Sequence, residues 1–237
     1  MTPPKLHPVG SSPLSRAGKM ALATLGLLPV CLLAATITWD GSENSNWSEK
    51  KNWDKNAPSA GDIAVFDGSV TNRSIILDAD QQVDGLVFSD ATGAGAFTFA
   101  VGNTLTIGVS GMSLLESASQ VFGAAIAMGA DQSWVAGNAS GGGITINGNV
   151  EIKPAGSGGG ARTLTLTAQN AANFFTFNGT ITNSAGNGRI VSNGAGTITL
   201  TGANSYTGYT FVDAGTLVVA NSSALGDAGA GSDQART

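Results

Sequence analysis

Apolar and polar residues alternate with a period of two in short runs along most of the chain. The clearest runs are residues 97–99, 104–107, 144–146, 163–167, 197–201 and 216–219, in which Thr alternates with Ile, Leu, Val or Phe. Successive side chains of an extended strand point to opposite faces, so each run predicts a strand with one apolar face. The pattern therefore predicts an all-β protein.

Clusters of Gly, Asn, Ser and Ala separate these runs, for example at residues 141–143, 156–160 and 186–188. Such residues accept the backbone angles of sharp corners. The runs recur about 20 to 40 residues apart, which is the spacing of one or two coils of a solenoid. An antiparallel sandwich fits the same alternation, so periodicity by itself leaves both architectures open.

The first 35 residues have the order of a secretory signal. Lys5, Arg16 and Lys19 precede an apolar run at residues 20–33, and Ala34 and Ala35 follow it. The run is interrupted by Pro29 and is shorter than the roughly 20 residues of a spanning helix, so residues 1–35 are predicted to be a cleaved signal peptide. A lipoprotein signal centred on Cys31 is the alternative, although Val30 is not the small residue expected before a lipidated Cys.

Removal of this segment changes the chemistry that the chain can perform. It takes away the only His, His7, and the only Cys, Cys31, and leaves 8 basic and 16 acidic residues. Catalysis by Ser-His-Asp or Cys-His groups and zinc sites of His and Cys are then excluded, as are disulfides. A net charge of −8 also argues against nucleic acid as a partner. No cofactor is predicted.

Composition divides the exported part into two regions. Residues 36–95 carry most of the charge and three of the four Trp, whereas residues 96–237 are rich in Gly, Thr and Asn and nearly uncharged. We predict an N-terminal cap and first strands at 36–95, and solenoid coils at 96–237.

A longer motif at residues 194–226 distinguishes between the two architectures. It begins Gly-Ala-Gly-Thr-Ile-Thr-Leu-Thr-Gly-Ala-Asn-Ser-Tyr-Thr-Gly, continues through Val212 to Gly215-Thr216-Leu217, and ends in Leu225-Gly226. This closely resembles the autotransporter-associated β-strand repeat, and it departs from that pattern at Tyr209, where the family usually has a second Gly. The segments around Trp39, Trp47 and Trp53 resemble the exported starts of the same family.

The resemblance implies a right-handed parallel β-helix. In such a coil the inward positions stack on one another, and each buried Leu or Ile contributes roughly 1.5–3 kcal/mol. The predicted inner stack consists of Ile198, Leu200, Leu217 and Val219. Thr197, Thr199 and Thr201 are predicted to face outward.

Two groups of residues are candidate sites, each with a structural alternative. Asp78, Asp80 and Asp84 have the chemistry of an acid/base pair or a calcium site, but they lack a calcium-loop signature, so solvated loop charges are the preferred interpretation. Trp39, Trp47 and Trp53 have the chemistry of a sugar-stacking platform; we prefer a bulky cap over the open end of the first coil. No catalytic, cofactor-binding or metal-binding residue is predicted.

These observations predict an exported, non-catalytic β-helical repeat protein, a structural or adhesive passenger fragment that is secreted or displayed at the cell surface. The alternative is a polysaccharide-binding or polysaccharide-degrading β-helix. Host or matrix glycans and surface proteins are the expected partners, and contact with a membrane is expected only through a separate barrel. The strand at 217–219 is expected to leave an open end through which copies self-associate.

Overall fold

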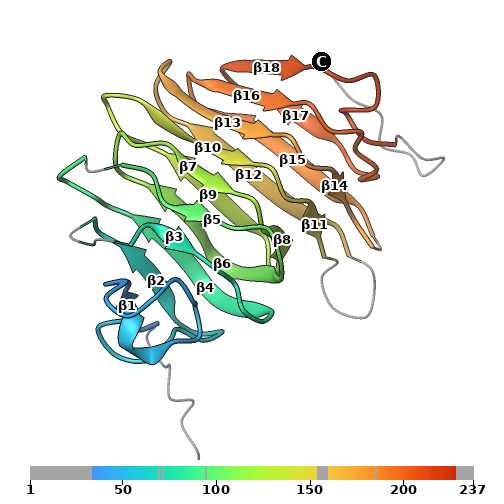
Figure 1. Ribbon diagram of the computed structural model, residues 1–237. Helices are drawn as coiled ribbons and strands as arrows, with labels where there is room; N and C mark the ends of the chain where they lie inside the picture. Colours follow the sequence, from blue (N-terminus) through green and yellow to red (C-terminus); the bar gives the residue numbers. More distant parts are fainter. Residues whose placement is uncertain are drawn as a thin grey trace, which may run out of the picture. The chain divides into compact units, whose positions relative to one another are not determined.

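The computed structural model describes residues 34–227 apart from 69, 71, 94, 154–159 and 185. Nearly all of the predicted signal peptide lies outside this range. Leu33–Thr237 forms one compact unit. Its described residues form an all-β solenoid of about seven turns with parallel sheets (Figure 1), as predicted. One short 3-10 helix, η1 (Lys50–Asn52), interrupts the loop after the first strand.

Two walls of strands make up the coils, and a shorter corner row adds a third strand to three of them. Wall A contains β1 (Thr36–Thr38), β2 (Ile63–Phe66), β4 (Gln81–Phe88), β6 (Thr104–Leu114), β9 (Gln132–Ala136), β12 (Arg162–Ala168), β15 (Gly188–Asn193) and β17 (Thr210–Val212). Wall B contains β3 (Ser74–Ile75), β5 (Thr98–Phe99), β7 (Gln120–Phe122), β10 (Gly142–Ile146), β13 (Asn173–Phe177), β16 (Thr197–Leu200) and β18 (Thr216–Val219). The corner row contains β8 (Ala125–Met128), β11 (Val150–Ile152) and β14 (Ile181–Thr182).

Every pair of neighbouring strands in these sheets is parallel, which excludes the antiparallel sandwich. Stacked residues are 24 positions apart at Ser74 and Thr98, 31 at Ile144 and Phe175, and 19 at Ile198 and Leu217. Each of the six alternating runs of the sequence contains a strand, and the runs 97–99 and 197–201 extend one residue beyond theirs. The right-handed sense of the coil stays a prediction.

The corner row arises where a long strand divides. The first half of β6 pairs with β8, placing Leu105 beside Ile126, and its second half pairs with β9, placing Met112 beside Trp134. Between the halves Gly111 adopts a φ of +64°, and a Cβ there would meet the Ser133 carbonyl at 2.2 Å. Only glycine satisfies both demands at this bend.

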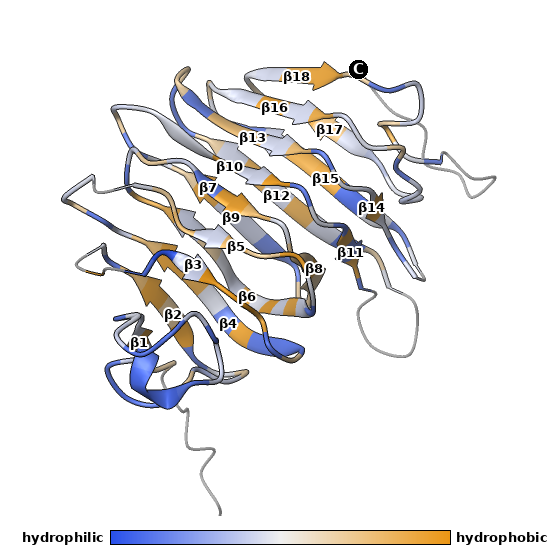
Figure 2. Ribbon diagram, in the orientation of Figure 1, coloured by the Kyte–Doolittle hydropathy of each residue, from blue (hydrophilic) through white to orange (hydrophobic). Residues whose placement is uncertain are grey.

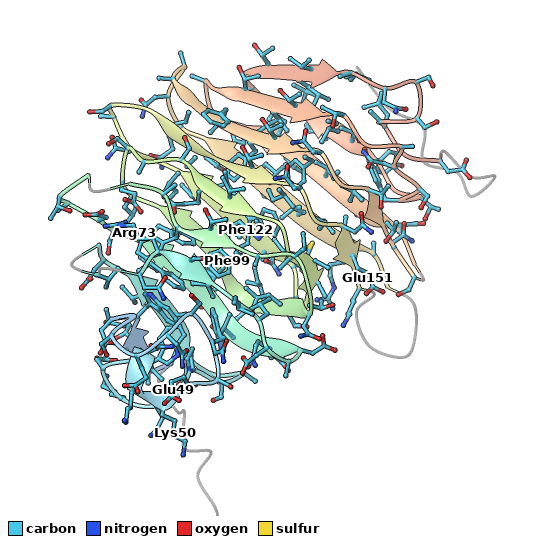
Figure 3. All side chains as sticks on the ribbon, in the orientation of Figure 1. Glu49, Lys50, Arg73, Phe99, Phe122 and Glu151 are labelled. Carbon is cyan, nitrogen blue, oxygen red and sulfur yellow. The ribbon has the colours of Figure 1, made fainter. Side chains whose placement is uncertain are left out.

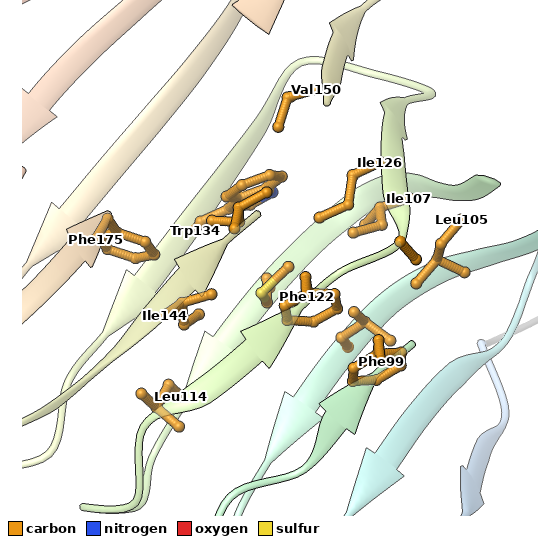
Figure 4. Close-up of a cluster of buried hydrophobic side chains, with 14 of the residues drawn as sticks. Phe99, Leu105, Ile107, Leu114, Phe122, Ile126, Trp134, Ile144, Val150 and Phe175 are labelled. Carbon is orange, nitrogen blue, oxygen red and sulfur yellow. The ribbon is translucent and has the colours of Figure 1, made fainter. Parts of the chain in front are cut away.

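The core is a set of apolar columns that run along the solenoid axis. On wall B one column passes through Ile75, Phe99, Phe122, Ile146, Phe177 and Leu200, with adjacent members on neighbouring coils. Phe99 and Phe122 stack with their ring centroids 4.3 Å apart (Figures 3 and 4). Hydrophobic and polar colours change along many of the strands in Figure 2, whereas β2 is hydrophobic throughout. Burial of these columns is the main source of stability in a fold without disulfides.

The predicted inner stack of the repeat is correct for β16 and only partly correct for β18. Ile198 and Leu200 are fully buried, whereas Leu217 is half-buried and Val219 is 46% exposed. The prediction of burial is therefore wrong for Val219, although it stacks on Leu200 in register. The reason is that no described strand lies above β18. As expected, the outward positions of this strand and of the residue after it are occupied by Thr197, Thr199 and Thr201, each of which lies between buried neighbours.

Candidate functional site

The corner of the repeat, residues 202–210, ties three coils together through Asn204. Its Oδ1 accepts a hydrogen bond of 2.7 Å from the Ile181 amide of the preceding coil. Its Nδ2 donates one of 2.6 Å to the Ala224 carbonyl of the following coil. The side chain is only 5% exposed, so these bonds satisfy buried backbone groups. The Asn of the repeat motif is thus a structural bridge.

Tyr206 fills the interior of the same corner. Its ring is fully buried and its hydroxyl shares a hydrogen bond with Thr210 Oγ1. Burial raises the pKa of Tyr206, and the bond from Thr210 offsets only part of that effect. The ring therefore stays neutral at physiological pH and acts as apolar filling with one satisfied polar end.

The corner stays tight although Tyr209 stands where the repeat usually has a second Gly. A Cβ at the preceding residue, Gly208, would lie 2.4 Å from the Gly188 carbonyl, so this position carries the close approach. Tyr209 instead faces outward, and the Arg189 guanidinium lies 5.5 Å from its ring centroid. A cation–π contact thereby occupies a position at which the family usually has Gly.

The three N-terminal Trp side chains form the interior of a cap. Trp39 and Trp47 are fully buried and Trp53 is 3% exposed. The Trp53 ring lies edge-on to the other two, with centroids 5.0 Å and 4.8 Å away. Because stacking on a sugar needs an exposed ring face, these residues are not a sugar platform.

The cap also covers the backbone edge of the first coil. Asp54 donates its amide to the Thr38 carbonyl and accepts the Thr38 amide on its Oδ1, at 2.9 and 2.8 Å. Lys55 Nζ donates to the Thr36 carbonyl at 2.7 Å. On wall B, Ile76 exchanges backbone bonds with Ser45 and Trp47. The edge groups of the first strands are therefore satisfied by the loop that follows β1.

Asp78 bonds to the loop after β1, whereas Asp80 and Asp84 both bond to residues of β6. Asp78 accepts from the amide and hydroxyl of Ser48, and Asp80 accepts the Thr104 amide at 2.8 Å. Asp84 accepts from the Val109 amide and the Ser110 hydroxyl. Burial raises the pKa of Asp78, but the Ser48 hydrogen bonds outweigh it and leave that pKa below its ordinary value. These contacts describe carboxylates that join segments, and they support the structural interpretation.

The same device recurs where the sequence did not single out an acid. The Thr163 amide donates to Asp131 Oδ1, and the Thr180 amide donates to Asn149 Oδ1. Within the described residues, no group of three or more His, Cys, Asp or Glu side chains has the arrangement of a metal site. A search of the same residues for a membrane-spanning helix found no candidate.

A buried ionic cluster, Arg73–Asp90–Glu116, was missed by the sequence analysis. Arg73 Nη2 lies 2.7 Å from Asp90 Oδ2, and the Asp90 side chain is fully buried. Burial raises the pKa of Glu116 to about 7, nearby Asp90 adds to the increase, and Arg73 opposes it. Arg73 immediately precedes β3, and Figure 3 shows it to one side of Phe99 and Phe122.

The pattern contains a signal for this cluster. Glu116 has the same parity as Met112 and Leu114, so an acid occupies an inward position two residues after the end of β6. Gln120 has the inward parity at the start of β7, and its Nε2 donates to Glu116 Oε1 at 3.1 Å. Its Oε1 accepts the Phe97 amide at 2.7 Å. Polar residues of inward parity at strand ends therefore mark buried corners of the coil.

The stacked coils and the Asn204 bridge define the class first: a β-solenoid built from repeated coils. Residues 190–219 then match the family model of the passenger-associated-transport-repeat, over β15 to β18. This match confirms the resemblance to autotransporter passenger repeats. A search of curated proteins found no match to the chain, and a search of solved structures found none.

Proposed function

We propose that the protein is an exported passenger domain that acts as a non-catalytic, adhesive scaffold outside the cell. The observation that carries the proposal is the passenger-associated-transport-repeat at residues 190–219, set in a parallel β-solenoid. Passenger repeats belong to secreted or surface-displayed proteins, and the order of residues in 1–35 is that of a secretory signal. The solenoid supplies a long, regular surface for partners.

The outer face of wall B is the surface that best suits adhesion. One outward column runs through Ser74, Thr98, Val121, Thr145, Thr176, Thr199 and Val218. Neighbouring members are about 4.8 Å apart, the spacing of paired strands. A column of hydroxyl and methyl groups offers many weak, equally spaced contacts, which together give avidity. Glycans and matrix proteins with repeating polar groups are the partners that suit such a face.

Two matched double variants test this surface. Thr145→Lys with Thr176→Lys places two charges in the outward column of wall B, and Thr163→Lys with Thr165→Lys places two charges on one strand of the outer face of wall A. We expect residues 33–237 to bind one or more glycans or matrix proteins on an array, with at least about tenfold loss for the wall B variant only. Equal losses for both variants, or no binding at all, would contradict the adhesive face.

The non-catalytic part of the proposal has a separate test. The polysaccharide-degrading alternative requires turnover, so every polysaccharide that binds is incubated with the protein and analysed for shortened or unsaturated products. We expect intact polymer. Product formation above that of a heat-denatured sample would replace the scaffold by an enzyme, whereas binding without products fits a scaffold or a polysaccharide-binding module.

A further inference from the structure

Four Asn-Gly pairs lie in the solenoid, and the structure holds their side chains in different ways. The pairs begin at Asn147, Asn178, Asn187 and Asn193. An Asn followed by Gly can cyclise, because the amide nitrogen of the glycine attacks the side-chain carbonyl carbon, Cγ, and no side chain of the glycine hinders the approach. The rate at each pair therefore depends on how the fold places these two atoms.

At Asn193 the two reacting groups are already in contact. The Gly194 amide donates a hydrogen bond of 2.7 Å to Asn193 Oδ1, and it has no other acceptor among the described residues. Because a C=O bond is about 1.23 Å long, Cγ lies no farther than about 3.9 Å from the attacking nitrogen. Asn193 is exposed at the end of β15, so water reaches the side chain. The pair is thus close to a reactive arrangement.

The fold itself requires glycine after Asn193. Gly194 adopts a φ of +85°, and a Cβ there would lie 2.2 Å from the Ala168 carbonyl of the coil below. A left-handed backbone at such a close approach excludes every other residue. The residue that makes Asn193 reactive is therefore fixed by the turn from wall A to wall B.

The other three pairs are held in unreactive arrangements. Asn178 Nδ2 donates to Asn147 Oδ1 at 2.8 Å, and Thr201 Oγ1 donates to Asn178 Oδ1 at 3.1 Å. At both of these pairs the glycine amide is also engaged by the coil below, in the bonds from Gly148 to the Phe122 carbonyl and from Gly179 to the Ile146 carbonyl. At Asn187, the following Gly188 is buried in β15 and paired with β12.

We propose that Asn193 is a site of spontaneous modification, at which the side-chain amide is converted to a carboxylate. The Gly194 nitrogen gives its proton to water and forms a bond to Asn193 Cγ, and the Cγ–Nδ2 bond breaks as ammonia leaves. Water then opens the cyclic imide at one of its two carbonyl carbons and gives aspartate or isoaspartate. Water is the co-reactant, and no electrons are transferred. The proposal is independent of the proposed adhesion.

The experiment compares the four pairs in residues 33–237, which form one compact unit. The protein is incubated at mildly alkaline pH, and the products at each Asn are measured by peptide mapping with mass spectrometry. Asn193 should convert at least about tenfold faster than any of the other three. In concentrated urea all four should convert at similar rates, because each Asn is then followed by an unrestrained Gly.

Asn193→Gln is the matched variant, because it keeps the amide but would have to close a larger ring. It should lose the fast product, and circular dichroism confirms that it is folded. Equal rates at Asn193 and Asn178 in the folded protein, faster conversion at Asn147 or Asn187, or no conversion at Asn193 while the sample in urea reacts would each overturn the proposal.

The modification should also loosen the turn after β15. Isoaspartate adds one carbon to the backbone beside Gly194, where the coil below leaves no room for a Cβ. The incubated protein should therefore unfold at lower urea than Asn193→Gln incubated for the same time, whereas the two should unfold together before incubation. Equal midpoints after incubation, with the product present at Asn193, would overturn this consequence.

Discussion

At the scale of the residue, the acidic side chains of this protein have two roles set by burial. Near the surface, backbone amides donate hydrogen bonds to Asp80, Asp84 and Asp131. Each of these charges stays in contact with water and holds a neighbouring segment in place. Glu116 is buried beside Asp90, where a second negative charge is costly. Burial and the neighbouring charge therefore keep Glu116 protonated to about neutral pH.

Glu116 should make the stability of the protein depend on pH. Its pKa is raised from 4.5 to about 7, so the unfolded chain loses this proton at lower pH than the folded one. Stability should therefore fall by about 1 to 3 kcal/mol as pH rises from 4.5 to 7. Glu116→Gln should abolish most of this slope in urea titrations. An unchanged slope in the variant would show that another group causes the dependence.

The pKa of Asp90 moves in the opposite direction, so Asp90 affects stability in a different pH range from Glu116. Burial raises it, but hydrogen bonds from Thr92 and Arg73, together with the Arg73 charge, leave it below its ordinary value of 3.8. The stability it provides is present above pH 3.8 and is lost as pH falls below that. Titrations between pH 4.5 and 8 therefore report on Glu116.

At the scale of the element, coils pack so closely at one corner that there is no room for a Cβ atom. Gly148, Gly179 and Gly202 follow the strands of wall B on successive coils. A Cβ on each would lie 2.0, 2.1 and 2.3 Å from a carbonyl of the coil below. The glycines are required here by the close approach of two backbones.

Gly179→Ala should therefore separate two coils and destabilise the protein by about 1 to 3 kcal/mol. Gly61→Ala is the matched control, because a Cβ at Gly61 meets no atom within 4 Å. We expect the control to be neutral or slightly stabilising, since it restricts the unfolded chain. Equal unfolding midpoints in urea for the two variants would mean that the corner accommodates the added methyl group without a loss of stability.

At the scale of the whole molecule, each coil contacts mainly its neighbours, so damage should stay local. Solenoids of this kind behave as a chain of coupled repeats. Three of the four Trp lie in the N-terminal cap, and Trp134 lies on β9 in the middle of wall A. Their fluorescence therefore reports on the N-terminal and central coils, whereas β-sheet circular dichroism reports on all of them.

Leu200→Asp buries a charge in β16 and should cost at least about 3 kcal/mol. We expect the C-terminal coils to unfold at lower urea than the cap, so that the circular dichroism transition precedes the Trp transition. Thr199→Asp faces outward on the same strand and should cost less than about 1 kcal/mol, with both transitions together. Similar losses in the two variants would mean that the inward and outward faces are reversed.

The sequence by itself determined the strands of the six alternating runs, their inward parity and the repeat, because these depend on local alternation and on a motif within 194–226. The same alternation allowed a sandwich, and only the pairing of residues about 19 to 31 positions apart decided for parallel coils. Arg73, Asp90 and Glu116 escaped detection because their contacts join different coils. Val219 has the pattern of a buried residue, yet its exposure depends on whether another strand lies above it. Burial at the end of a solenoid is a property of the stack, and no local pattern contains it.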